Sequence, residues 1–179
     1  MLKKVLLAIV VVVAVLAVVV ATRPSTYRIQ RSIHLAAPPE VTYAQVVSLH
    51  RWEAWSPWAK LDPAAKSTYE GPAAGVGAIF RWAGNNQVGE GSMTIMESRP
   101  AELVRFRLDF LKPFKVTNTA EFTFQPDGGQ TVVTWSMTGK SSFICKAVGL
   151  FMNMDKMIGG QFEKGLADLK SVSEAAGKP

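Results

Sequence analysis

A long apolar stripe runs along the carboxy-terminal part of the chain, from Ser142 to about Ala176. Its apolar residues are mostly three or four positions apart, which is the spacing of one face of an α-helix. They are Phe143, Ala147, Leu150, Phe151, Met154, Met157, Ile158, Phe162, Leu166 and Leu169. Full burial of one Leu, Met or Phe side chain is worth roughly 1.5–3 kcal/mol, so the stripe needs a broad apolar partner. The sequence therefore predicts one long helix that packs on a sheet.

Two consecutive glycines, Gly159 and Gly160, lie in the middle of this predicted helix. In a helix interior, two glycines cost roughly 2 kcal/mol relative to alanine. The pair therefore marks either a bend or a place where another backbone, or a bound molecule, comes close. The bend is the simpler of these interpretations.

The preceding hundred or so residues have the patterns of strands. Apolar and polar residues alternate from Tyr27 to Leu35, as in a half-buried strand, and a helix is expected to start at the prolines before Glu40. About six further strands follow, joined by turns such as Pro126–Gly129. Their inward residues include Val104, Phe106, Leu108, Phe110, Ala120, Phe122, Phe124, Val133, Trp135 and Met137. This order predicts an α+β fold in which the long helix covers an antiparallel sheet.

The amino-terminal segment contains only Val, Leu, Ile and Ala from Val5 to Ala21. As a helix it would be roughly 25 Å long, slightly less than the hydrocarbon core of a bilayer, and the flanking Lys3 and Lys4 can snorkel. We expect residues 1–23 to be a single transmembrane anchor, 24–26 a linker and 27–176 a domain. A cleaved signal sequence is the alternative, although this apolar run is longer than is usual for one. The short basic tail places the domain on the extracytoplasmic side.

Composition excludes several kinds of site. Cys145 is the only cysteine and there are two histidines, so neither a disulfide framework nor a metal site is expected, and no cofactor is predicted. The net charge of +6 permits contact with an anionic surface. Because the chain carries an apolar anchor, we expect that surface to be a membrane and expect no nucleic-acid partner.

Three tryptophans lie three positions apart at Trp52, Trp55 and Trp58, so they are expected to cluster on a short helix or tight turn. An aromatic cluster beside basic residues can stack nucleic-acid bases or sit at a membrane interface, and the membrane is the better fit of these two. The alternative is that the three side chains plug the open end of a barrel-like sheet.

Several short segments together resemble the START-like superfamily, and more closely its SRPBCC or polyketide cyclase/dehydrase branch. They are Ala37–Val41, Trp52–Trp58, Asp62–Pro63, Gly75–Ala78, Val88–Gly91 and Phe162–Leu166. The resemblance covers about Tyr27 to Lys170 and implies a helix-grip fold, in which a curved antiparallel sheet of about seven strands wraps around a long carboxy-terminal helix. It also implies an apolar cavity between the two. Members of the family bind lipids, sterols or polyketides, and a minority are enzymes.

The first functional hypothesis is therefore membrane-tethered binding of a hydrophobic small molecule or lipid in that cavity. The predicted lining is Trp82, Met93, Ile95, Phe106, Leu108, Phe122, Trp135, Met137, Phe151, Met154 and Met157. The alternative for these residues is a solid core without a cavity, since large side chains also pack closely.

Two other functions stay open. One is a cyclase or hydrolase that uses an inward-facing carboxylate of raised pKa, for which Glu90, Glu97 and Asp155 are the candidates. No nucleophile is evident beside either histidine. The other is an interaction module that docks a protein or the bilayer through the tryptophan cluster.

Overall fold

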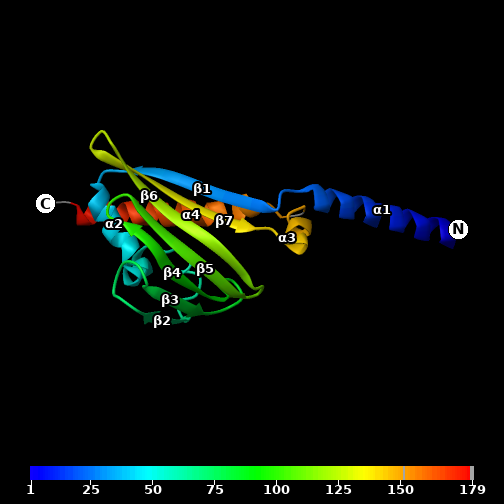
Figure 1. The fold of residues 1–179 in the computed structure, drawn as a ribbon, viewed down its shortest axis with the longest axis horizontal. Coiled ribbons are helices and arrows are strands. Elements are labelled where there is room, and N and C mark those ends of the chain that lie inside the picture. The colour runs from blue at the N-terminus through cyan, green and yellow to red at the C-terminus, as the bar shows by residue number, and fades with distance from the viewer. Residues whose placement is uncertain (151, 178–179) are drawn as a thin grey trace.

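The computed structural model describes residues 1–150 and 152–177, and these residues form one seven-stranded antiparallel sheet. The strands are β1 (Thr26–Leu35), β2 (Lys66–Glu70), β3 (Ile79–Ala83), β4 (Glu90–Arg99), β5 (Leu103–Lys112), β6 (Val116–Asp127) and β7 (Gln130–Lys140). Strands β2 to β7 follow one another across the sheet, and β1 pairs with β7 at one edge. The predicted α+β helix-grip fold is confirmed (Figure 1).

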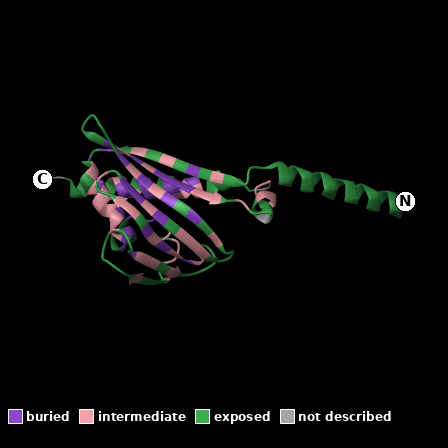
Figure 2. Ribbon diagram, viewed as in Figure 1, coloured by how far each residue is buried: buried purple, intermediate pink, exposed green. Residues whose placement is uncertain are grey.

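The helices are α1 (Leu2–Thr22), α2 (Pro39–Val47), the short 3-10 helix η1 (Leu49–Ala54), α3 (Phe143–Val148) and α4 (Met154–Ala176). Figure 1 shows α4 lying along the sheet, whereas α1 projects away from the domain as a separate rod. Among the described residues, α1 alone is long and apolar enough to cross a membrane. Nearly all of its side chains are exposed, as Figure 2 shows, and only Val20 is buried.

The prediction of one long carboxy-terminal helix is wrong in its first part. The side-chain oxygen of Ser142 accepts a hydrogen bond from the amide of Cys145 and caps the start of α3, which ends at Val148. The side chain of Asn153 then caps a second helix by accepting from the amide of Lys156, at 2.9 Å. The stripe is therefore not covered from end to end. Phe162, Leu166 and Leu169 are buried, but Phe143, Met154 and Met157 are exposed.

One glycine of the pair, Gly159, marks the close approach of a side chain. Helix α4 continues through both residues. A Cβ atom on Gly159 would overlap the guanidinium of Arg31, whereas one on Gly160 would meet nothing within 4 Å. The lack of a side chain at Gly159 thus allows Arg31 of β1 to lie against α4.

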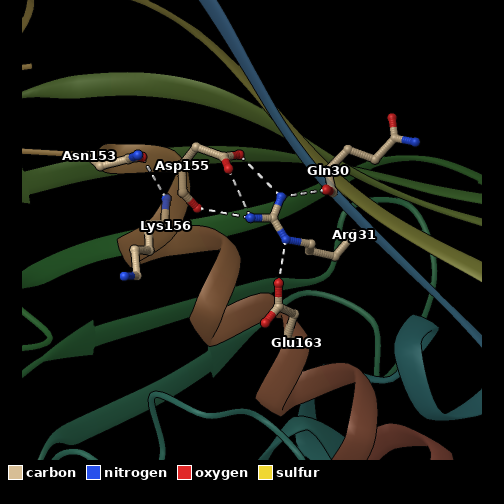
Figure 3. Close-up of polar contacts among 6 residues, drawn as sticks. All are labelled: Gln30, Arg31, Asn153, Asp155, Lys156 and Glu163. Atoms are coloured by element: carbon tan, nitrogen blue, oxygen red, sulfur yellow. Dashed lines mark hydrogen bonds and ion pairs between the residues drawn. The ribbon is translucent and has the colours of Figure 1, made fainter.

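Arg31 ties α4 to the edge strand through several charged contacts, drawn in Figure 3. Its Nη2 donates to Asp155 Oδ2 at 2.9 Å, and its Nε donates to Glu163 Oε1 at 2.6 Å. Its Nη1 also donates to the carbonyl oxygen of Gln30, at 2.8 Å. These contacts hold the first three turns of α4 on β1, which is the strand that α4 mainly covers.

The core lies between α4 and the inner face of the sheet and is mostly aromatic. The ring of Trp135 is stacked on Phe162 with 4.2 Å between centroids, and on its other neighbour Phe122 at 4.7 Å. Trp52 and Trp55 pack together at 4.4 Å and contact the same rings. Offset and edge-to-face pairs of this kind stabilise a core beyond the area that they bury.

The expected clustering of the tryptophans is found, but docking through them is wrong. Trp55 is 0% and Trp52 8% exposed. The indole N–H of Trp52 donates to the carbonyl oxygen of Val46 at 2.9 Å, and that of Trp55 donates to the carbonyl oxygen of Gln45 at 3.3 Å. Trp58 is half-buried and packs edge-on against Trp135. Trp52 and Trp55 fill the inner side of the sheet, so they offer no surface for a partner, and Trp58 alone does not form a cluster.

Candidate functional site

The inner face of the sheet has a covered part and a half-open part. Helix α4 lies mainly over β1, and the residues of β6 and β7 beneath it are buried. Farther along the sheet, five inward side chains on β2, β3 and the second half of β5 are only half-buried. We call these five side chains the aromatic face: Tyr69, Phe80, Trp82, Leu108 and Phe110.

Strand register places the aromatic face on the inner side of the sheet. Phe80 and Leu108 are both cross-strand partners of Met93, which is buried. Directly paired residues on neighbouring strands point to the same side. Trp82 and Phe110 are likewise both partners of Gly91. The aromatic face is thus a continuation of the core that α4 does not cover.

The rings of the aromatic face touch one another and form a continuous surface. Tyr69 and Phe80 have centroids 5.2 Å apart, and Phe80 and Trp82 are stacked at 5.9 Å. The indole of Trp82 lies over Gly91, where a Cβ atom would be only 2.6 Å from Cζ2. Its Nε1 donates to the carbonyl oxygen of Val88 at 3.0 Å, which fixes the ring. The surface is therefore preformed and apolar.

Asn118 brings a polar group directly beside this surface. It is the cross-strand partner of Leu108 on one side and of Gly139 on the other, and it is only 4% exposed. Its Nδ2 has a weak contact with the sulfur of Met137, at 3.7 Å. In the described part of the chain, its Oδ1 has no hydrogen-bond partner of normal geometry. Such a buried, unsatisfied acceptor costs about 1–3 kcal/mol.

Tyr27 and Trp135 add two further polar groups to the inner face. Tyr27 is paired with Gly139, and a Cβ atom on that glycine would lie 2.7 Å from the tyrosine hydroxyl. Burial raises the pKa of Tyr27, and a hydrogen bond with the side chain of Asn118 acts in the opposite direction. The hydroxyl therefore stays protonated at neutral pH. The Nε1 of Trp135, which is 2% exposed, also lacks a partner among the described residues.

The structure distributes the predicted cavity residues over three environments. Met93, Ile95, Phe106, Phe122, Trp135 and Met137 are buried on the inner face. Trp82 and Leu108 belong to the half-open aromatic face. Met154 and Met157 are 43% and 51% exposed on α4, and Phe151 lies outside the described residues. That these residues line one cavity stays a prediction.

The three candidate carboxylates all lie in surface ion pairs. Glu90 Oε2 is 2.7 Å from Lys112 Nζ. Asp155 is bound by Arg31, whose hydrogen bonds lower the pKa of that carboxyl group. A general acid buried in a cavity would have its pKa raised instead. Asp155 therefore lacks the environment that the carboxylate hypothesis requires.

The prediction that Glu97 shares a strand face with Met93 and Ile95 is wrong. The register between β4 and β5 shifts between Ile95 and Glu97, which is a β-bulge. The extra residue turns Glu97 to the other side of the sheet, where it forms an ion pair with Arg105. The β-bulge thus removes the one candidate that the alternation had placed inward.

Sequence reasoning missed Asn118, Tyr69 and Phe80 as site residues. A signal for Asn118 was present, because it lies two positions before Ala120, which was predicted to point inward. Tyr69 and Phe80 lie on the short strands β2 and β3, where the alternation of apolar and polar residues is too brief to indicate which side chains point inward.

Comparison with known proteins identifies the family. Residues 26–174 match the family described as polyketide cyclase/dehydrase and lipid transport. The chain belongs to this family. The resemblance stated from the sequence is therefore confirmed, and the family match excludes α1. No sequence among the curated proteins matches the chain.

Solved structures with the polyketide cyclase-like fold align with most of the chain. Protein CV1439 from Chromobacterium violaceum has a TM-score of 0.59 and 17% identity, covering 85% of this chain and 99% of its own. The Aha1 dimer from Colwellia psychrerythraea has a TM-score of 0.59 and 16% identity, covering 83% and 96%. The di-domain ARO/CYC StfQ from the steffimycin biosynthetic pathway has a TM-score of 0.60 and 12% identity, covering 84% and 51%. At these identities the likeness shows the fold alone.

Proposed function

We propose that this protein binds a hydrophobic small molecule or lipid on the aromatic face, while α1 holds it in a membrane. The family to which the chain belongs includes lipid-transport proteins by its description, which supports this class of ligand. The observation that carries the proposal is the position of Asn118. A buried acceptor without a partner lies directly beside a preformed and half-open aromatic surface.

One row of residues across the sheet suggests what the ligand looks like. Cross-strand pairing links Tyr27, Gly139, Asn118, Leu108, Met93, Phe80 and Tyr69 in that order. The row is polar at the β1 side and apolar from Leu108 onward. A matching ligand has a flat or extended apolar body and one hydroxyl or amide group that donates to Asn118 Oδ1. Sterols, polyketides and acyl lipids with a hydroxyl or amide near one end all meet this description.

The energetic support comes from the exposed part of the aromatic face. Apolar surface removed from water contributes about 25 cal/mol per Å². A ligand lying on these half-buried rings would gain this contribution, and it would also satisfy an acceptor that is costly to leave buried. A preformed surface adds to affinity, because little side-chain freedom is lost when the ligand binds.

Helix α1 supports the membrane part of the proposal. Its 21 residues are apolar enough to span a bilayer, and nearly all their side chains are exposed. Lys3 and Lys4 lie in its first turn, before the apolar run that starts at Val5, which favours a cytoplasmic amino terminus and a domain on the opposite side. A cleaved signal sequence is the alternative, and the length of the mature chain distinguishes the two.

Binding can be tested with the full chain in lipid nanodiscs. The probes are a fluorescent sterol and a dansyl-labelled fatty acid, whose absorption overlaps tryptophan emission. We expect energy transfer from the protein to at least one of them. Asn118→Leu should weaken binding of a hydroxyl-bearing probe about tenfold, the equivalent of one lost hydrogen bond. The side chain of Asn118 also contacts Tyr27 and Met137, so the stability of the ligand-free variant is measured beside its binding.

Two variants separate the aromatic face from the rest of the sheet. Trp82→Ala removes the central ring of the face and should weaken both probes. Arg107→Gln changes an exposed residue of the same sheet and should change neither. The proposal would be refuted if no probe bound and native mass spectrometry of the purified chain showed no retained apolar molecule. Equal weakening by Trp82→Ala and Arg107→Gln would place any binding elsewhere.

A further inference from the structure

Exposed apolar side chains gather at one end of the domain. Strand register places the start of β1, the end of β7, the start of β6 and the end of β5 together at this end. Outside residues 1–22, nine large apolar side chains in the described part of the chain are exposed, and seven belong to this end. We call the seven the docking end: Leu111, Phe114, Phe143, Val148, Met152, Met154 and Met157.

The docking end consists of two neighbouring structures that project from the sheet. Leu111 and Phe114 lie at the turn between β5 and β6, and Phe114 is 71% exposed. The other five lie on α3, on the connection that follows it and on the first turn of α4. Large apolar side chains grouped on one surface indicate an interaction site, whereas isolated ones do not.

Lysines surround these apolar side chains. Lys115, Lys140 and Lys156 are exposed, and Lys146 is half-exposed on α3. Among the described residues, no carboxylate lies within ion-pair distance of these four. Apolar side chains that enter the interface and lysines that reach anionic headgroups form the usual combination at a bilayer surface.

The apolar helix α1 starts from the same end of the domain. Only residues 23–25 separate α1 from β1, and three residues span at most about 10 Å. Helix α1 contacts α3, and the amide of Ser141 donates to the carbonyl oxygen of Ser25 at 2.9 Å. Figure 1 shows α3 beside the junction of α1 with the domain. A membrane that holds α1 therefore lies directly against α3.

We propose that the docking end lies in the interface of the bilayer that holds α1, with its apolar side chains inserted and its lysines on anionic phospholipids. This inference rests on the membrane tether proposed above. Insertion of the docking end would fix the orientation of the domain relative to the bilayer, which a flexible tether alone would not do. Asn118 and Tyr27 pair with Gly139 near the same end of the sheet. An apolar ligand would then reach the site from the bilayer without crossing bulk water.

The single cysteine of the chain allows a direct test, because Cys145 is exposed on α3. The full chain is labelled there with an NBD fluorophore and reconstituted in nanodiscs of phosphatidylcholine with one quarter phosphatidylglycerol. We expect blue-shifted emission and strong quenching by lipids that carry a nitroxide on the acyl chain. A matched control carries Cys145→Ser and Gln130→Cys, which moves the label to an exposed residue at the far end of the sheet. It should show neither effect.

Variants of the docking end test the surface itself. Phe114→Ser with Phe143→Ser should lower the quenching at Cys145 at least twofold, and Lys115→Gln with Lys140→Gln should remove its dependence on the anionic lipid. Both pairs are exposed, so the fold should persist.

Alkaline washing separates the failure of this inference from the failure of the tether. The same chain is reconstituted in vesicles, which are then washed at alkaline pH. If the chain stays in the vesicles but its Cys145 label behaves like the label on Gln130→Cys, the tether exists and the docking end does not insert. A chain removed by the wash overturns both the tether and the inference that rests on it. Unchanged quenching in the double serine variant would also overturn the inference.

Discussion

The adjacent glycines of α4 allow a sharp test of how Arg31 holds this helix. Alanine is about 0.8–1 kcal/mol better than glycine in a helix interior. Gly160 has nothing within 4 Å of its Cβ position, so Gly160→Ala should raise the free energy of unfolding by about 1 kcal/mol. At Gly159 the same methyl group would overlap the Arg31 guanidinium and would also lie 3.0 Å from its Nε. Arg31 must then move, and its contacts with Asp155 and Glu163 are lost.

We therefore expect Gly159→Ala to gain nothing or to lose stability, although its helix propensity improves equally. The difference between the two variants should be at least about 1 kcal/mol, or roughly 2–4 °C in Tm for a chain of this size. Urea unfolding of the full chain in detergent micelles, followed by tryptophan fluorescence, measures it. Trp55 and Trp135 are 0% and 2% exposed, so their emission reports loss of the core.

An Arg31→Ala background completes the test. Without the guanidinium, Gly159→Ala should stabilise the protein by about 1 kcal/mol, as Gly160→Ala does. Equal effects of the two alanines in the wild-type background would refute the reasoning. So would a Gly159→Ala variant that stays unfavourable when Arg31 is absent, because some other contact would then be responsible.

Three further predictions use the same unfolding assay. Phe162→Ala should cost about 3–5 kcal/mol, because the ring is 2% exposed and stacked on Trp135; a loss below 1 kcal/mol would contradict the stacking. Arg31 lowers the pKa of Asp155, so the stabilisation from Asp155 is present above about pH 4 and is lost as the pH falls through the folded-state pKa. Asp155→Asn should therefore flatten the decline in stability between pH 5 and pH 2, and an unchanged decline would exclude this contribution. Ala101 has a φ of 57°, so Ala101→Gly should raise stability by up to about 1 kcal/mol, whereas a loss would contradict that backbone conformation.

Much of the sheet could be predicted from the sequence because alternation persists through the long strands. The residues expected to point inward on β6 and β7, from Ala120 to Met137, are buried as predicted. A β-bulge has no comparable signature. The register shift after Ile95 depends on pairing with β5, and a single extra residue reversed the expected side of Glu97.

The break between α3 and α4 shows a different limit. The spacing of three and four positions continues across residues 149–153, so periodicity alone predicts one helix. The capping residues Ser142 and Asn153 were visible in the sequence, but such residues also occur where no helix starts. Asn118 was hidden for a related reason, since an inward polar residue becomes a candidate only when its lack of a partner is known.

The position of β1 determines the order in which the domain can be completed. Strands β2 to β7 pair with neighbours in the chain, so they can assemble hairpin by hairpin during synthesis. Strand β1 is made first, yet its partner β7 follows about a hundred residues later. Such a long-range pairing forms late, because a large loop must close. If α1 has entered the bilayer by then, β1 is held at the membrane surface. The pairing of β1 with β7, which completes the sheet, then occurs at the membrane rather than in solution.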